Sequence, residues 1–163
     1  MGFSRLVLED WSSAPSALVE ARGVRFGDGA IKFLRRLEAV PSVVVVGGEC
    51  DASALALLAS ATLGFVTDDV TVSVDVDSAL ALGLTSTLPA AIGGATARAL
   101  LFGGPADATA VRRSGLAIDG DPEEAAARLA EPAAALLLRS LRVAAHSTRD
   151  QARQYDDELR QLR

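Results

Sequence analysis

The sequence contains a single cysteine, Cys50, and no long hydrophobic run. One thiol can form neither an intramolecular disulfide nor a cysteine metal cluster, which predicts a reducing compartment and no metal site. No stretch approaches the roughly 20 consecutive apolar residues that a membrane helix needs. The first residues also lack the apolar segment of a signal peptide. We therefore expect a cytoplasmic protein without a membrane partner, in which Cys50 is a small buried residue rather than a nucleophile.

Aromatic residues and positive charge are also scarce. Only 4% of the residues are aromatic although 50% are hydrophobic, so the core must consist mainly of Ala, Val and Leu. The formal net charge is −5 and the sequence pI is about 4.9. Such a charge provides no basic field for a phosphate backbone, and we expect no nucleic-acid partner.

The first half of the chain predicts short strands alternating with helices. Residues 43–46 are all valine, and a β-branched run without alternation is typical of a strand buried on both faces of a sheet. Apolar residues at helical spacing predict one amphipathic helix over 31–38 and one buried helix over 53–61. Further short strands are expected at 6–8, 17–21, 63–66 and 70–74.

The second half predicts helices alone. Glycine and proline divide it into short helices at 78–84, 88–92, 95–102 and 108–113. Asp121 followed by Pro122 is a helix start, another helix begins near Pro132, and a charged helix covers about 148–162. The length of 163 residues favours one folded domain, because domains commonly contain roughly 100 to 200 residues.

Residues 40–48, followed by 55–60 and 67–69, resemble the central signature of the crotonase (enoyl-CoA hydratase/isomerase) superfamily. The resemblance implies an α/β fold, a crotonase-like spiral of short βα units with C-terminal helices. It divides the chain into a spiral core at 1–106 and a helical oligomerisation region at 107–163. In the family, such C-terminal helices drive assembly into a trimer or a hexamer, and the apolar surface of residues 133–141 favours the same expectation.

The resemblance also implies an oxyanion hole, in which two backbone N–H groups hold a thioester oxygen. The first family loop is similar to residues 26–30, with Asp28 at the donor position and Gly29 beside it. The second, glycine-rich loop corresponds to residues 52–54, with Ser53 at the donor position and Ala54 beside it. A coenzyme A thioester is therefore the implied ligand, and no cofactor is implied.

The catalytic carboxylates of the family are missing from this chain. Ala56 stands at the position of the first family glutamate, and the second aligns near Val76. Asp75 and Asp77 flank that position and are weak catalytic candidates, because a shift of one residue on a strand turns a side chain to the opposite face. Glu49 and Asp51, beside the second loop, could act as acids, although loop carboxylates are usually solvated.

Residues 33–41 and 48–50 resemble the DpgB-type crotonases, which work beside a type III polyketide synthase. The resemblance implies a pseudoenzyme in secondary metabolism, an acyl-CoA-binding accessory subunit supporting a polyketide synthase or a full-length crotonase. Two alternatives remain open. One is an active acyl-CoA hydratase, isomerase or lyase with displaced carboxylates, and the other is a structural oligomer without a ligand.

Overall fold

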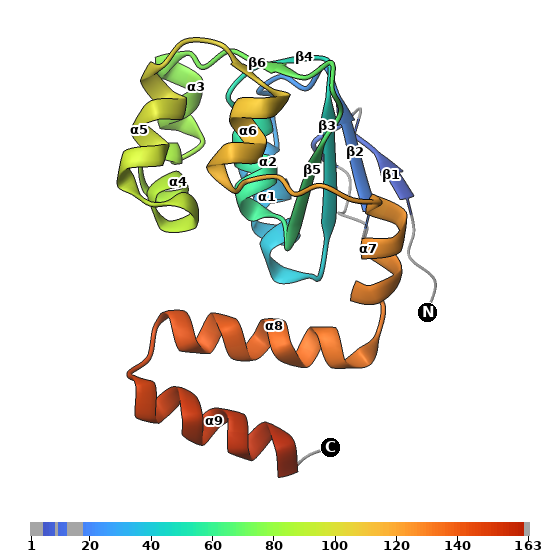
Figure 1. Cartoon of the computed structure of the whole chain (residues 1–163), viewed down its shortest axis with the longest axis vertical. Coiled ribbons are helices and arrows are strands. Elements are labelled where there is room, and N and C mark those ends of the chain that lie inside the picture. Colours follow the sequence, from blue (N-terminus) through green and yellow to red (C-terminus); the bar gives the residue numbers. More distant parts are fainter. Residues whose placement is uncertain (1–4, 9, 13–17, 162–163) are drawn as a thin grey trace.

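The computed structural model describes residues 5–8, 10–12 and 18–161, and its main sheet contains four parallel strands (Figure 1). The strand order is β1, β2, β3 and β5. Their bounds are Arg5–Val7, Leu18–Arg22, Val43–Gly47 and Leu63–Val66. Parallel strands require crossover connections, and helices α1 (Ala30–Ala39) and α2 (Ser53–Ser60) provide two of them. The predicted α/β class is confirmed.

A second, smaller sheet lies beside the ends of the main strands. It contains β4 (Glu49–Cys50), β6 (Thr71–Val72) and β7 (Ala106–Asp107). Strand β6 pairs in parallel with β4 and antiparallel with β7. The prediction that the second half of the chain contains helices alone is therefore wrong, because β7 lies there. The strand expected at 70–74 is shorter than predicted. Two-residue strands depend on a partner far along the chain, so no local pattern marks them.

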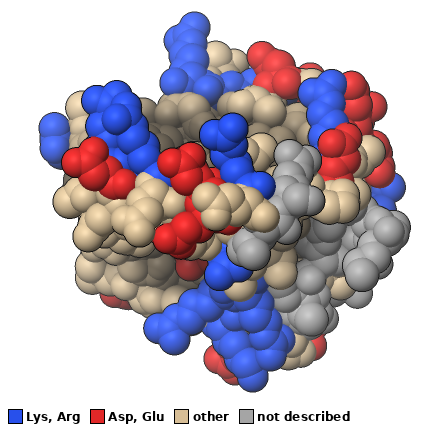
Figure 2. All heavy atoms as spheres, turned by 90° about the horizontal axis from the view of Figure 1, so that it is seen from below, with Lys and Arg blue, Asp and Glu red and all other residues tan. Residues whose placement is uncertain are grey.

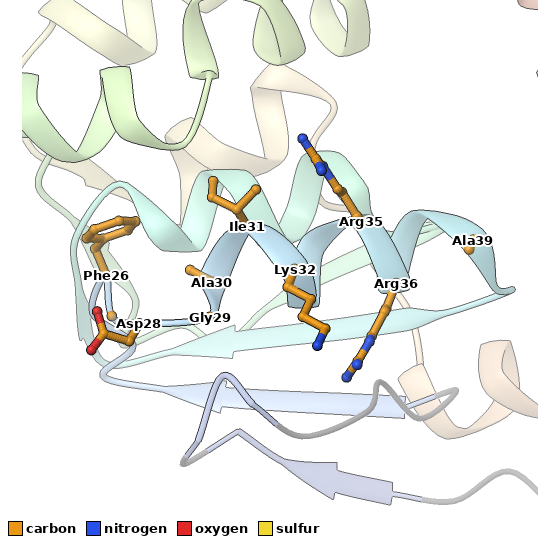
Figure 3. Close-up of a pocket in the computed structure, with 10 residues that line it drawn as sticks. Phe26, Asp28, Gly29, Ala30, Ile31, Lys32, Arg35, Arg36 and Ala39 are labelled. Atoms are coloured by element: carbon orange, nitrogen blue, oxygen red, sulfur yellow. The ribbon is translucent and has the colours of Figure 1, made fainter.

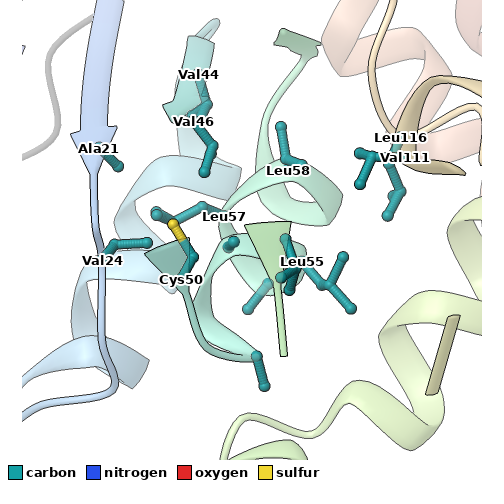
Figure 4. Packing of buried hydrophobic residues seen from close by; sticks show 14 of the residues in the cluster. Ala21, Val24, Val44, Val46, Cys50, Leu55, Leu57, Leu58, Val111 and Leu116 are labelled. Atoms are coloured by element: carbon teal, nitrogen blue, oxygen red, sulfur yellow. The ribbon is translucent and has the colours of Figure 1, made fainter. Parts of the chain in front are cut away.

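Helices cover both faces of the main sheet. In Figure 1, α1 and α2 lie on one face, and α7 (Pro122–Leu129) lies on the other. The valine strand β3 is buried between these layers, and Val43, Val44 and Val46 are fully inaccessible. Val44 and Val46 belong to the large cluster that includes α1 and α2, whereas Val43 packs with Ala126 of α7. The predicted double-sided burial of this strand is confirmed, and Figure 4 shows the α2 side of the core.

Three helices, α3 (Val76–Ala81), α4 (Leu84–Ile92) and α5 (Gly94–Phe102), form a separate group beside α2. The sequence predicted helices at 78–84 and 88–92, but the break lies before Leu84, and α4 runs without interruption through Pro89. Leu84 and Leu88 of α4 are fully buried. Their packing outweighs the cost of an interior proline, which tertiary contacts can offset.

The chain ends in two helices, α8 (Pro132–Ala145) and α9 (Arg149–Gln161), which pack on each other below the sheet (Figure 1). They follow α6 (Ala108–Ser114) and α7. Neither α8 nor α9 contains a buried residue. The guanidinium of Arg142 donates hydrogen bonds to the carbonyl oxygens of Glu38 and Ala39 at the end of α1. The boundary predicted at residues 106 and 107 runs through β7, and the oligomerisation role of the C-terminal region stays a prediction.

Candidate functional site

The two loops that the sequence singled out lie side by side, where α1 and α2 begin. Loop 26–30 leads into α1, and Gly29 has a φ of 83°, a left-handed conformation that favours glycine. The second loop, predicted at 52–54, is largely the first turn of α2, which begins at Ser53. Just before it, the Asp51 N–H donates to the Val24 carbonyl oxygen at 3.2 Å. Trp11 supports the first loop, because its indole N–H donates to the Arg25 carbonyl oxygen at 2.9 Å.

The side chain of Asp51 joins the two loops. Its Oδ2 accepts a hydrogen bond from the Phe26 N–H at 2.6 Å, and its Oδ1 accepts one from the Ser53 N–H at 2.8 Å. We call these two N–H groups the amide pair. The Ser53 N–H, predicted from the sequence as an oxyanion donor, is therefore already bonded to a carboxylate of the same chain. The sequence placed Phe26 in the first loop but named Asp28 as the donor, because the hydrogen bond between Phe26 and Asp51 is a tertiary contact.

The other predicted loop residues take no part in this contact. Asp28 and Gly29 are exposed at the start of α1. The Ala54 N–H donates to the main-chain carbonyl oxygen of Asp51 at 3.2 Å, and Ala54 is buried. Ser53 is also fully buried, and its hydroxyl has no hydrogen-bond partner among the described residues. Their roles in binding stay predictions, but only Ser53 belongs to the amide pair.

No carboxylate lies at the position of the first family glutamate. Ala56 is 3% exposed on α2 and lines a cavity of about 310 Å³. Four hydrophobic side chains from α1 and from residues 80–82 line the same cavity, namely Ile31, Leu34, Leu80 and Leu82. Arg35 and Glu38 of α1 also line this cavity, and the Glu38 carboxylate accepts a hydrogen bond from the Ser60 hydroxyl at 3.2 Å. The position of the family glutamate therefore lacks a carboxylate, although the cavity wall itself is mixed.

Asp75 and Asp77 lie at a helix start, and the expectation that they lie on a strand is wrong. Asp75 is the N-cap of α3, where its carboxylate accepts the Ser78 N–H at 2.8 Å. This backbone hydrogen bond is the main cause that lowers the pKa of Asp75 below its usual value. Asp77 is exposed in the first turn of α3. A general acid needs a raised pKa near neutrality, so the environment of Asp75 opposes that role.

A groove of about 720 Å³ runs along the exposed side of α1, from Phe26 to Ala39. Figure 3 shows Ile31 and Arg35 on one side of this helix and Lys32 and Arg36 on the other. Phe26, whose N–H belongs to the amide pair, lines one end of the groove. The groove therefore offers both apolar side chains and cationic side chains along one helix.

Neither Cys50 nor the single histidine, His146, shows features of a reactive group. Cys50 is 2% exposed, and burial raises the pKa of its thiol, as expected for an unreactive residue. His146 is exposed at the C-cap of α8. No group of three or more His, Cys, Asp or Glu side chains in the described ranges is arranged to hold a metal ion.

The surface seen in Figure 2 carries Lys and Arg side chains interspersed with Asp and Glu side chains. This face therefore has no field of a single sign. Among the described residues, no helix is both long enough and apolar enough to span a bilayer.

The fold is similar to that of several solved structures. An enoyl-CoA hydratase from Bacillus anthracis has a TM-score of 0.68 at 15% identity, covering 93% of this chain and 74% of that one. An enoyl-CoA hydratase from Thermoplasma volcanium also has a TM-score of 0.68, at 14% identity, with coverages of 89% and 72%. An enoyl-CoA hydratase/isomerase from Cupriavidus metallidurans has a TM-score of 0.64 at 22% identity.

The Cupriavidus comparison covers 82% of this chain but only 57% of that protein, so the present chain spans little more than half its length. The sequence matches no protein-family model and no curated protein. Identities of 14% to 22% establish the fold and leave the activity open. The crotonase-like architecture expected from the sequence is confirmed, and the chain has the fold of enoyl-CoA hydratase/isomerase structures.

Proposed function

We propose that this chain is a cytoplasmic pseudoenzyme, an acyl-CoA-binding accessory subunit that supports a partner enzyme in polyketide-type biosynthesis. The observation that carries the proposal is that buried Ala56 stands where the family has a carboxylate, at a cavity beside the starts of α1 and α2. General acid–base help contributes typically about 100- to 10,000-fold per group. A protein without these groups retains binding but loses most of the hydration rate.

The groove along α1 supports coenzyme A thioesters as the ligand class. Lys32, Arg35 and Arg36 offer three cationic groups for phosphates. Phe26 and Ile31 are exposed hydrophobic residues, at 42% and 38%, on which an apolar pantetheine or acyl chain can pack. Ligand sites commonly combine an apolar wall with a few polar groups in this way. The protein itself needs no cofactor under this proposal.

Self-association into a trimer or a hexamer belongs to the same proposal. Leu137 and Leu141 lie one helical turn apart on α8, and each is 66% exposed. A second copy of the chain is the occupant that the family resemblance favours for this apolar stripe. The proposed partner enzyme is a polyketide synthase or a full-length crotonase.

An active enzyme with displaced carboxylates is the weaker alternative. It requires Asp75 or Asp77 to act as an acid or a base. The Asp75 carboxylate is engaged in capping α3, and its pKa is lowered rather than raised. A structural oligomer without a ligand is the second alternative, and the groove along α1 argues against it.

Binding and turnover measured on one preparation test the proposal. We expect calorimetry to detect crotonyl-CoA, while hydration stays at least about 10,000-fold below that of an ordinary hydratase, as expected when two acid–base groups are missing. Lys32→Glu should weaken binding severalfold, because it reverses a charge in the groove. Arg149→Glu makes the same charge change on α9 and should leave binding unchanged. Turnover at an ordinary rate, abolished by Asp75→Asn or Asp77→Asn, would establish the active alternative instead.

A further inference from the structure

The amide pair directs two main-chain donors at one carboxylate, each at its own oxygen. The Phe26 and Ser53 N–H groups come from different loops, yet both donate to one carboxylate, at 2.6 and 2.8 Å. Hydrogen bonds to an ionised acceptor are short and strong compared with those to a neutral carbonyl. A thioester oxygen that approached the same two donors would have to displace the carboxylate.

Asp51 is not buried in the hydrophobic core. It is partly exposed, and Phe26 lines the end of the groove along α1. The Phe26 side of the amide pair is therefore next to the groove where we place the ligand, whereas Ser53 is fully buried. A carboxylate at this position opposes a second anionic oxygen by charge as well as by occupancy.

One main-chain hydrogen bond links the two segments without the Asp51 side chain, and two more fix the second segment in place. The Asp51 N–H bonds to Val24, the Ala54 N–H bonds to the Asp51 carbonyl oxygen, and the Ser73 N–H bonds to the carbonyl oxygen of Cys50. These bonds have lengths of 3.2, 3.2 and 2.9 Å. The amide pair should consequently stay in place when the carboxylate is removed.

We propose that Asp51 is a specificity-determining residue, whose carboxylate occupies the amide pair and keeps a thioester oxygen out of it. The proposal rests on the proposed function, since it concerns the same acyl-CoA site. It implies that the natural protein recognises coenzyme A through the groove but gives the thioester carbonyl no hydrogen bonds. Under this proposal, the two crotonase-like loops no longer polarise the thioester carbonyl, and the site binds only the coenzyme A part of the ligand.

The test compares free coenzyme A with crotonyl-CoA, because only the thioester has the carbonyl oxygen. In the natural protein, we expect the two affinities to differ by less than about twofold. In Asp51→Ala, crotonyl-CoA should bind about tenfold more tightly than free coenzyme A, as expected for two newly formed hydrogen bonds. Taking the ratio removes the general effect of losing one negative charge. Glu49→Gln removes the charge of an exposed side chain on β4 and should leave the ratio unchanged.

Amide hydrogen exchange provides a readout that does not need a ligand. The Phe26 and Ser53 amides should exchange slowly in the natural protein and at least about tenfold faster in Asp51→Ala, because the carboxylate protects them. The Ala54 amide bonds to main chain and serves as the internal control. Asp51→Asn retains the size of the side chain and one acceptor oxygen, so it should protect the pair only in part, even if Asp51→Ala does not fold.

The outcomes separate this proposal from the proposed function. If crotonyl-CoA binds but the affinity ratio is the same with and without the carboxylate, the role of Asp51 is refuted and ligand binding survives. If no variant binds either compound, the proposed function fails, and exchange of the two amides alone decides whether Asp51 occupies the pair. Equal exchange in the natural protein and both Asp51 variants would refute the occupancy itself.

Discussion

Helices α2 and α8 are both rich in Ala and Leu, but their surroundings are opposite. In α2, Leu55 and Leu57 are completely buried between the main sheet and neighbouring helices. In α8, Leu137 and Leu141 are each 66% exposed, and α9 covers only part of the helix. The comparison shows that apolar composition alone does not place a helix in the core. The sheet decides burial for α2, whereas α8 retains a surface available to another molecule.

The largest expected effect is a difference in stability between matched leucine truncations. Leu57→Ala removes a fully buried side chain from α2 and should lower the free energy of unfolding by about 2 to 5 kcal/mol. Leu137→Ala removes an exposed one from α8 and should cost less than about 0.5 kcal/mol at low protein concentration. Chemical denaturation of both variants measures the difference. Equal losses would mean that α8 is as well packed as α2.

The next effect concerns the exposed stripe of α8 rather than the stability of the chain. We expect Leu137→Glu to reduce the mass measured by light scattering from that of an oligomer to the 16.8 kDa of one chain. The reason is that a carboxylate in an apolar contact loses its hydration. Ala135→Glu makes the same charge change about half a turn away and should preserve the oligomer. A mass of 16.8 kDa for the unmodified protein at micromolar concentration would contradict self-association.

The smallest effect is electrostatic and concerns Asp69, which follows strand β5 of the main sheet. Asp69 accepts hydrogen bonds from Thr67 and Arg22, and these contacts lower its pKa below the usual 3.8. A depressed pKa stabilises the fold above the unfolded-state value, and this contribution disappears as the pH falls through the folded-state value. The difference in unfolding free energy between the natural protein and Asp69→Asn should therefore shrink below about pH 4. Denaturation curves at several pH values measure this difference, and a constant difference would argue against the assignment.

The sequence predicted features that depend on local pattern. The four valines of β3 identified a strand buried on both faces because such a run has no polar side to expose. Asp121 and Pro122 identified the start of α7, where the Asp121 carboxylate caps the helix. The resemblance to crotonases, carried by residues 40–69, extended these local signals to the correct overall architecture.

Features that depend on distant partners were not predictable in the same way. Asp75 reads as the end of a strand, and only the structure shows that it caps α3. Strand β7 exists because Ala106 faces Val72 in a ladder, which no local pattern indicates. The sequence singled out both loops, but not the carboxylate that bonds to each of them. Asp51 was interpreted as a solvated loop residue, since nothing near it in the sequence indicates that the Phe26 N–H lies within reach.

The parallel arrangement of the main sheet also has a consequence for folding kinetics. No two of its four strands are joined by a tight turn, since β3 pairs with β2 on one side and β5 on the other. A complete helix separates β3 from each partner along the chain. The ordering entropy of these long connections must be overcome before the strands pair, which slows folding relative to hairpin-based sheets. The rate-limiting step is thus expected to be the packing of α1 and α2 against the main sheet before all its strands have paired, rather than the formation of any single turn.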